Sequence, residues 1–265
     1  MNRFEDKVAI ITGASTGLGP VMAKMMAAEG CKLVLAARKG HLCEEVAHEI
    51  GENAIGMTTD VTDEDSVAKM VGAAMDKWGK VDVLMSNAAQ PGKDLWVWEE
   101  TVENFLETYK VDCMAAMLCS KHVLNRSMLE RKQGSIVTFS SGAGWSGLPR
   151  KSHYSAAKGA LIVFTKTLAK EVGPYGIRAN CLVPGAIATE LLVNYHKRIA
   201  GERGVAYEVV RDEAAAEVPL KTISTPEDIA HAARFLIENE AVTGQTIYVD
   251  GGRRFRSYER DMGFM

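Results

Sequence analysis

Short, mostly apolar runs rich in β-branched residues alternate along the chain with longer segments of helical periodicity. The runs cover residues 7–12, 32–37, 54–59, 81–86, 134–141, 178–183 and 246–249. The helical pattern covers residues 20–29, 44–50, 63–78, 101–131, 153–172 and 226–238. Apolar strands without polar alternation, each followed by a helix, are typical of a parallel sheet that is covered on both faces. The pattern predicts an α/β fold: one doubly wound domain with about seven parallel strands.

No proline- or serine-rich linker and no internal repeat divides residues 1–252, so we expect a single domain over this range. Residues 186–224 have no regular pattern. Within them, the charged segment 190–218 is expected to act as a lid that orders over a substrate. Residues 253–265 form a C-terminal tail. We expect it to fray, and the alternative is that its aromatic residues reach the pocket of a neighbouring subunit.

The charge pattern excludes several classes of partner. The net charge is −3, and the two signs are interspersed, so neither nucleic acid nor an anionic membrane surface is an expected partner. The N-terminal residues lack the apolar core of a signal peptide, and no apolar run has membrane-spanning length. The five cysteines are scattered without metal-ligand spacing. We therefore expect reduced thiols, no metal and a cytoplasmic location.

Glycines at positions 13, 17 and 19 lie between the first strand and the first helix. Glycine lets the backbone turn sharply and approach a ligand closely, and the start of the helix offers free N–H groups to a phosphate. Pro20 is compatible with this first helical turn. The loop is therefore a candidate dinucleotide-phosphate site, and the alternative is an ordinary glycine-rich turn.

The fifth strand leads into a loop that begins at Ser141 and ends in the helix carrying Tyr154 and Lys158. Tyr154 and Lys158 are four residues apart and share one helical face. An ammonium about 4 Å from a phenol, at an effective dielectric constant of about 20, lowers the phenol pKa by about three units. A tuned phenol and a serine hydroxyl suit proton transfer at a carbonyl or alcohol carbon. The alternative is an amphipathic surface pair.

Several motifs in order along the chain resemble those of short-chain dehydrogenases/reductases. They are Thr12–Gly19, Asp60-Val61, Asn87-Ala88-Ala89, Ser141, Tyr154–Lys158, Pro184-Gly185 and Val249–Gly252. The resemblance implies a Rossmann domain that transfers a hydride between a nicotinamide cofactor and an alcohol/ketone pair. It makes Tyr154 the acid/base, with Lys158 tuning it and holding the nicotinamide ribose, and Ser141 the partner of the substrate oxygen.

The resemblance also assigns cofactor contacts along the first half of the chain and beyond. The implied residues are Gly13, Ser15, Thr16, Gly17, Leu18, Gly19, Asp60, Val61, Asn87, Ala88, Ala89, Tyr154, Lys158, Pro184, Gly185, Ile187 and Thr189. Asp60 would bind the adenine, and Ile187 and Thr189 the carboxamide. Asp60 could equally cap the helix that follows it, and Asn87 could be a structural turn residue.

The residues after the second strand bear on the choice of nicotinamide cofactor. A carboxylate there would bind the free ribose hydroxyl of NAD, but this chain has Ala37 followed by Arg38 and Lys39. Guanidinium and ammonium groups suit the 2′-phosphate of NADP, so we expect NADP, with NAD possible. The alternative is that Arg38 only stacks on the adenine.

One position departs from the family pattern. Asp112 stands where relatives usually carry an asparagine that helps to position a water near the lysine. An ionised Asp112 would offset part of the charge of Lys158 and raise the tyrosine pKa. We expect an alkaline optimum for oxidation or a preference for reduction. The alternative is a shifted register with a purely structural Asp112.

Substrate contacts are expected from residues that fall where relatives build the pocket: Gln90, Trp96, Trp145, Leu148, His153, Leu191 and Leu192. Their character favours a bulky apolar or aromatic small molecule. Trp145 and His153 could instead pack under the loop. A non-catalytic dinucleotide-binding regulator and an epimerase or dehydratase using the same triad are the alternative functions. Members of this family commonly form tetramers through the two long helices, so we expect a homotetramer or homodimer.

Overall fold

The computed structural model describes residues 3–253, and within them the side chain of Leu191 is not described. Seven strands of this part form one parallel sheet in the order β3-β2-β1-β4-β5-β6-β7. The strands are β1 (Val8–Thr12), β2 (Lys32–Ala37), β3 (Ala54–Thr58), β4 (Val83–Ser86), β5 (Gly134–Phe139), β6 (Ile177–Pro184) and β7 (Thr246–Val249). The predicted doubly wound α/β fold is confirmed. The order reverses between β1 and β4, where such sheets bind their ligands.

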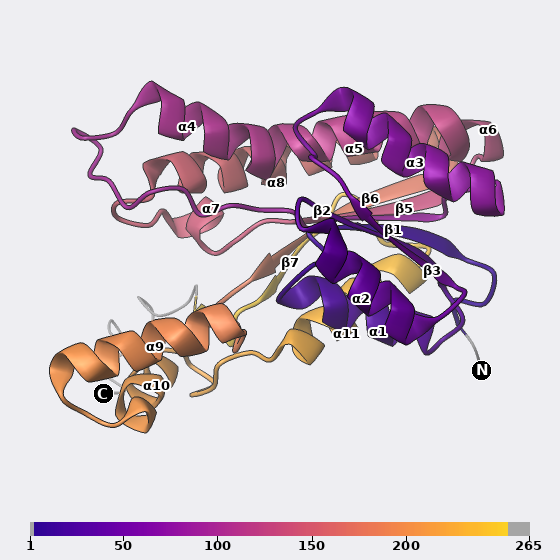
Figure 1. Cartoon of the computed structure of the whole chain (residues 1–265). Helices are drawn as coiled ribbons and strands as arrows, with labels where there is room; N and C mark the ends of the chain where they lie inside the picture. The colour runs from indigo at the N-terminus through magenta and orange to yellow at the C-terminus, as the bar shows by residue number, and fades with distance from the viewer. Residues whose placement is uncertain (1–2, 254–265) are drawn as a thin grey trace.

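Helices cover both faces of the sheet (Figure 1). One layer contains α3 (Glu64–Trp78), the long segment from α4 to α6, and α8 (Ser152–Val172); the other contains α1 (Leu18–Ala27), α2 (Gly40–Ile50) and α11 (Pro226–Glu238). Strand β1 shows why its run is continuously apolar. Ala9 and Ile11 pack into the core under α1 and α11, whereas Val8 and Ile10 pack into the core under α3 and α8.

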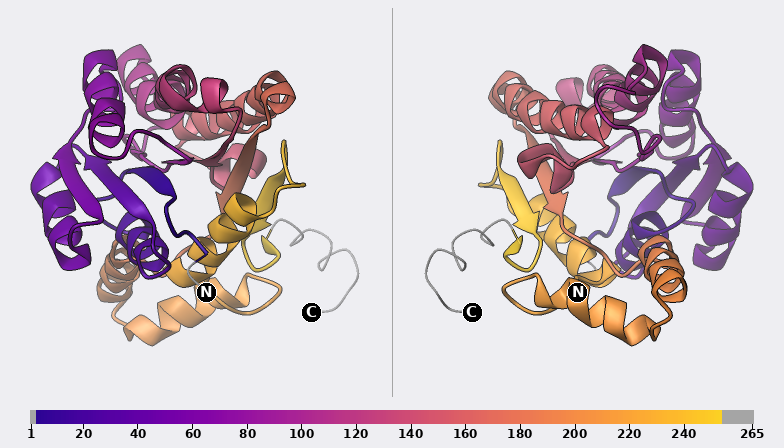
Figure 2. Two further views of the ribbon diagram at one scale, coloured as in Figure 1. Left: turned by 90° about the vertical axis from the view of Figure 1, so that its right-hand side faces the viewer. Right: turned by 90° about the vertical axis from the view of Figure 1, so that its left-hand side faces the viewer.

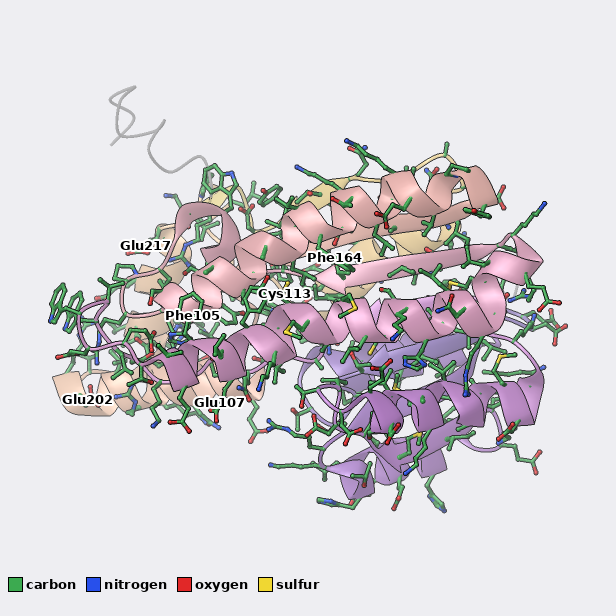
Figure 3. All side chains as sticks on the ribbon, turned by 90° about the horizontal axis from the view of Figure 1, so that it is seen from above. Phe105, Glu107, Cys113, Phe164, Glu202 and Glu217 are labelled. Carbon is green, nitrogen blue, oxygen red and sulfur yellow. The ribbon has the colours of Figure 1, made fainter. Side chains whose placement is uncertain are left out.

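The segment predicted as one helix over residues 101–131 contains two π-helical turns. Helices α4 (Val102–Tyr109), α5 (Ala115–Val123) and α6 (Leu129–Arg131) are separated by π turns at Lys110–Met114 and Leu124–Met128. A π turn inserts one residue into a helix and is frequent at functional sites. The first one carries Asp112. Seen from above, the long segment runs beside α8, with Cys113 and Phe164 labelled on the two helices (Figure 3).

The prediction that residues 186–224 are irregular is wrong. They contain α9 (Glu190–Arg203) and α10 (Tyr207–Ala216), which lie outside the two helix layers, beyond the ends of the strands (Figures 1 and 2). Val210 is the one buried residue of α10, so the apolar periodicity that reveals a helix is weak. Surface ion pairs such as Arg198–Glu202 and Arg203–Glu213 support these helices instead.

The cysteines fit the expectation of reduced thiols, and all five are buried and free. Burial raises the pKa of the Cys31 thiol to about 12, which keeps it protonated. Within residues 3–253, no helix combines the length and the apolar character needed to cross a membrane. The same residues contain no cluster of side chains suited to a metal ion. The predicted behaviour of the tail concerns residues that lie, except Arg253, outside the described part.

Candidate active site

The glycine loop is held against the end of β4. The Asn87 amide donates to the carbonyls of Thr12 and Gly13, at 3.1 and 3.2 Å. Gly13 has a φ of +66°, and a Cβ there would lie 2.9 Å from Ala88 Cα. Only glycine fits a site that combines this backbone conformation with so close an approach. Asn87 is therefore a structural link between loop and strand, and the loop packs so closely on Ala88 that a side chain at Gly13 would clash with it.

A cleft of about 480 Å³ opens beside this loop. It brings together most of the predicted cofactor residues: Gly13, Ser15, Thr16, Leu18, Arg38, Lys39, Asp60, Val61, Asn87, Ala88 and Ala89, joined by Ala37, Thr59 and Val111. The side chains of Arg38 and Lys39 are exposed at this cleft. Gly17 is the N-cap of α1, and Gly19 packs on Ala14, where a Cβ would lie 2.5 Å from Ala14 Cα. The cleft thus has a backbone cradle at one end and two cations at the other.

Asp60 has a structural role within this cleft. Its Oδ1 accepts hydrogen bonds from the backbone N–H and the hydroxyl of Thr62, at 2.9 and 2.7 Å. These bonds, with a smaller contribution from Arg38, lower the pKa of Asp60. Helix α3 is capped by Asp63, whose side chain accepts from Ser66 N, so Asp60 itself is not the cap. It shapes the turn and still lines the cleft.

Lys158 lies at the centre of the second predicted group. Its side chain is buried, and Nζ is 2.9 Å from the Phe139 carbonyl and 2.9 Å from Asp112 Oδ1. Nζ also lies 5.7 Å from the centre of the Tyr154 ring. Burial alone would lower the pKa of Lys158, but the charges of Asp112 and Tyr154 outweigh it and raise the pKa. The lysine is therefore a fixed cation beside the tyrosine.

Asp112, which lies in the first π turn of the long helical segment, pairs with the Lys158 ammonium. Its Oδ2 accepts a hydrogen bond from the backbone N–H of Gln90 at 3.1 Å. Burial raises the pKa of Asp112, and Lys158 opposes this rise. The extra residue of the π turn places the carboxylate directly on the lysine. This contact is an ion pair, not the water-linked arrangement that the family pattern implies for an asparagine.

The loop after β5 is fastened to the helix that carries Tyr154. Ser140 Oγ donates to the Lys158 carbonyl at 2.8 Å. Ser141 Oγ accepts from Ala143 N at 3.3 Å, at the start of the short helix α7 (Ala143–Ser146). A Cβ on Gly144 would lie 2.6 Å from the carbonyl carbon of Lys158, so α7 packs closely on α8. Ser141 is thereby held on the rigid end of the sheet.

A second cleft, of about 360 Å³, opens at Ser141. It contains the predicted residues Ser141, Trp145, Leu148, Pro184 and Gly185. It also contains Tyr248, Asp250 and Arg253, which the sequence reasoning missed. Their position follows from strand pairing, since β7 lies beside β6 with Tyr248 opposite Val183. Trp145 and Tyr248 meet edge to face, with ring centres 6.4 Å apart.

Other predicted substrate residues lie elsewhere. The prediction for His153 is wrong, because the side chain is fully buried and its ring nitrogens face Glu100 and Pro91. Trp96 stacks on Trp98 at the surface, with ring centres 5.2 Å apart. Gln90 contributes its backbone to Asp112.

The remaining predicted residues belong to the segment that leads into α9. Leu192 lines a separate cavity between α9 and α10 with His196 and Tyr207. Leu191 lies in α9, and its side chain is outside the described part. Ile187 pairs with Ser224 in a short β-bridge, and Thr189 is the N-cap of α9. These two residues thus anchor the start of the helical segment.

Comparisons with known proteins agree with this geometry. The profile of the family described as "Enoyl-(Acyl carrier protein) reductase" matches residues 13–254. The chain is a short-chain dehydrogenase/reductase. A 3-oxoacyl-[acyl-carrier-protein] reductase of Synechocystis sp. is 33% identical over 259 residues, which are 95% of this chain and 98% of that protein.

Two solved structures of this family are similar over nearly the whole chain. Actinorhodin polyketide ketoreductase, solved as a variant with NADPH, has a TM-score of 0.86 and 31% identity, covering 93% of this chain and 97% of its own. Levodione reductase has a TM-score of 0.86 and 30% identity, covering 94% and 98%. This short-chain dehydrogenase/reductase is therefore an oxidoreductase.

Proposed function

We propose that the protein interconverts a ketone and a secondary alcohol with NADP(H), and that Tyr154 is the acid/base. The observation that carries this proposal is the position of Lys158 Nζ, 5.7 Å from the Tyr154 ring and held by the Phe139 carbonyl. A fixed ammonium stabilises the phenolate and makes the phenol a better acid near neutral pH. Ser141 binds the substrate oxygen, and Lys158 keeps a further N–H for the cofactor ribose.

The residues at the first cleft fit a phosphorylated dinucleotide. The pyrophosphate binds at the glycine loop, whose residues Gly13, Ser15 and Thr16 line the cleft, and at the start of α1. Arg38 and Lys39 bind the 2′-phosphate, and Ala37 provides no carboxylate to repel it. The bound cofactor supplies the hydride. The NADPH in the ketoreductase structure supports this choice, and NAD is the alternative.

The substrate is a ketone with an apolar body. Trp145, Leu148 and Tyr248 give the cleft beside Ser141 an apolar and aromatic wall. A 3-oxoacyl thioester is the second candidate, because of the name of the Synechocystis relative. For either substrate, α9 and α10 act as the lid over the bound substrate. They come soon after Pro184 and Gly185, which line this cleft.

The ion pair of Asp112 and Lys158 favours reduction. A carboxylate 2.9 Å from Lys158 Nζ offsets part of the positive charge that would stabilise a phenolate. A phenol is the form of tyrosine that donates a proton to a carbonyl as it is reduced. Oxidation of the alcohol needs the phenolate and is expected only at alkaline pH.

Assembly through the long helices completes the proposal. The side chains of Val102, Leu106, Met114, Met117 and Val163 are exposed on α4, the first π turn, α5 and α8. Exposed apolar side chains on two neighbouring helices suit a two-fold helix-to-helix contact. We propose that residues 1–252 form one domain that assembles as a homotetramer or homodimer.

The test follows NADPH and NADH absorbance with aromatic, alicyclic, steroid and 3-oxoacyl-thioester ketones and with the matching alcohols. NADPH-dependent reduction of at least one ketone class is expected. Nucleotide binding without any turnover would favour a regulatory protein of the same fold. Conversion of a substrate without net nicotinamide turnover would favour epimerase or dehydratase chemistry on the same triad.

A further inference from the structure

His153 immediately precedes Tyr154 in the first turn of α8, and its side chain is fully buried. Its Nδ1 is 2.5 Å from Glu100 Oε2, and its Nε2 is 3.1 Å from the Pro91 carbonyl. A carboxylate and a carbonyl only accept hydrogen bonds. A ring that carries a proton on each nitrogen therefore satisfies both contacts, and a neutral ring satisfies one.

The Asn104 amide nitrogen also lies 3.2 Å from Nδ1, but it donates at 2.7 Å to Glu100 Oε1, and Asn104 Oδ1 accepts from Lys93 N. The orientation of this amide is thus fixed by its other partners. The amide keeps a second hydrogen, but the nearer neighbour of His153 Nδ1 is Glu100 Oε2, which can only accept, so Nδ1 carries the proton of this contact.

Glu100 is held as a carboxylate anion by four hydrogen bonds. Its carboxylate accepts from the backbone N–H of Thr101, the amide of Asn104, the hydroxyl of Ser152 and the ring of His153. Burial would raise the pKa of Glu100, but these hydrogen bonds outweigh it and lower the pKa to about 2. The side chain of Glu100 is 9% exposed. An ionised carboxylate therefore faces His153 throughout the neutral range.

The same turn of α8 is fastened to the loop after β4 by further contacts. Lys151 Nζ donates to the carbonyls of Pro91 and Gly92 and pairs with Asp94 at 2.6 Å. Leu95 N donates to the Arg150 carbonyl at 3.1 Å. Gly92 has a φ of +61°, and a Cβ there would lie 2.5 Å from His153 Nε2. The loop passes directly over the histidine ring.

This loop also reaches the ion pair under Tyr154. Gln90 N donates to Asp112 Oδ2, and the next residue, Pro91, accepts from His153. One peptide segment thus contacts both the ion pair and the turn that presents Tyr154. Helix α4 begins just after Glu100, and α8 carries His153. The two helices lie side by side (Figures 1 and 3).

We propose that His153 is a positioning residue, protonated on both ring nitrogens, that fixes the turn carrying Tyr154 against residues 91–100. The proposal rests on the proposed function, in which Tyr154 is the acid. Glu100 faces the His153 ring directly, and the ion pair of Lys151 and Asp94 lies nearby. The ion pair of Asp112 and Lys158 lies beyond Pro91. Among residues 3–253, Glu100 is the one carboxylate that contacts the ring. Since Tyr154 follows in the chain, loss of the bridge misplaces the phenol.

The test uses the full chain with histidine labelled with ¹⁵N, sedimented and studied by magic-angle-spinning NMR at pH 7, with and without NADPH. The variants are His153→Gln and Glu100→Gln, with His48→Gln as a matched control because His48 is exposed on α2. The wild type should show one ring with both nitrogens protonated in a buried environment. That signal should vanish in His153→Gln, become a neutral ring in Glu100→Gln and persist in His48→Gln.

Turnover of the ketone found for the wild type should fall about 10- to 100-fold in kcat for both site variants. The dissociation constant for NADPH should stay within about twofold, because the nucleotide cleft lies on other elements. If His153→Gln does not fold, Glu100→Gln, which keeps the shape of the side chain, carries the test. A His153 ring with one unprotonated nitrogen, or an unchanged kcat in folded variants, would overturn the proposal. If the wild type reduces no ketone, the proposed function fails, and the spectra alone still decide whether His153 bridges.

Discussion

Asp112 Oδ1 lies 2.9 Å from Lys158 Nζ, and both side chains are buried. The lysine that should acidify Tyr154 therefore shares its charge with a carboxylate. The π turn at Lys110–Met114 makes this contact possible, because its extra residue moves Asp112 onto the ammonium. The chain thus retains the tyrosine and lysine of its family and changes the electrostatic field in which they act.

Replacement of Asp112 by Asn should make alcohol oxidation less alkaline. A unit charge about 10 Å from an ionisable group, at an effective dielectric constant of about 20, changes its pKa by about one unit. Removing the carboxylate leaves the charge of Lys158 to act on Tyr154 alone. The pH dependence of kcat/KM for oxidation, measured from pH 6 to pH 11, should shift by about one unit to lower pH.

The matched control is Asp82→Asn. Asp82 is also buried, and it pairs with Arg131 just before β4, at the opposite end of the sheet from Ser141. Its replacement should destabilise the fold and leave the profile of oxidation where it is. Equal shifts in both variants, or none in Asp112→Asn, would remove the role given to the ion pair.

The Glu100 carboxylate should stabilise the fold above its ordinary pKa. Its pKa falls from 4.5 to about 2 on folding, so the unfolded chain binds the proton more tightly. The stabilisation is present above about pH 4.5 and is lost as the pH falls toward about 2, by up to about 3 kcal/mol. Denaturant unfolding at a series of pH values should show a loss of stability in acid that is smaller in Glu100→Gln than in the wild type by this amount. The exposed Glu107→Gln should behave as the wild type; if it matches Glu100→Gln instead, Glu100 is not the source.

Arg38→Ala should weaken NADPH selectively. A hydrogen bond to a charged partner contributes about 1.5–3 kcal/mol, so KM for NADPH should rise about 10- to 100-fold. NADH lacks the 2′-phosphate and serves as the internal control, with a KM change below about threefold. Ala37→Asp should raise KM for NADPH, because its carboxylate repels the 2′-phosphate. It should lower KM for NADH, because the carboxylate accepts hydrogen bonds from the free ribose hydroxyls. Equal effects on both nucleotides would show that Arg38 only stacks on the adenine.

Leu106→Glu should break the proposed assembly. The Leu106 side chain is 50% exposed on α4, and a carboxylate there would be buried without a partner in a helix-to-helix contact. Light scattering coupled to size exclusion should report a smaller species than for the wild type. Val209→Glu, on α10 and 41% exposed, should keep the wild-type mass. A wild type that is already monomeric would refute the assembly.

The fold could be predicted from the sequence because its central strands are buried on both faces. An apolar run such as Val8–Thr12 needs a core above and below it, and this requirement identifies the parallel sheet directly. Helices α9 and α10 escaped prediction because they bury few side chains and rely on surface ion pairs. Their apolar periodicity is too weak to distinguish them from a loop.

The candidate site was predictable where backbone geometry dictates the residue. Gly13 must be glycine because of its φ and its approach to Ala88, and Tyr154 and Lys158 share a face because of helical spacing. His153 was misplaced, since nothing in the local pattern announces a partner 53 residues away in Glu100. The π turn under Asp112 is likewise a tertiary feature with no local signature.

The most direct test of the proposed function compares the wild type with Tyr154→Phe in NADPH-dependent reduction of the ketone panel. Nucleotide binding is measured by fluorescence on the same samples. The proposed function predicts turnover in the wild type, a fall of about 10²- to 10⁴-fold in kcat in Tyr154→Phe, and equal affinity for NADPH. A Tyr154→Phe variant that reduces the same ketone at the wild-type rate would contradict it.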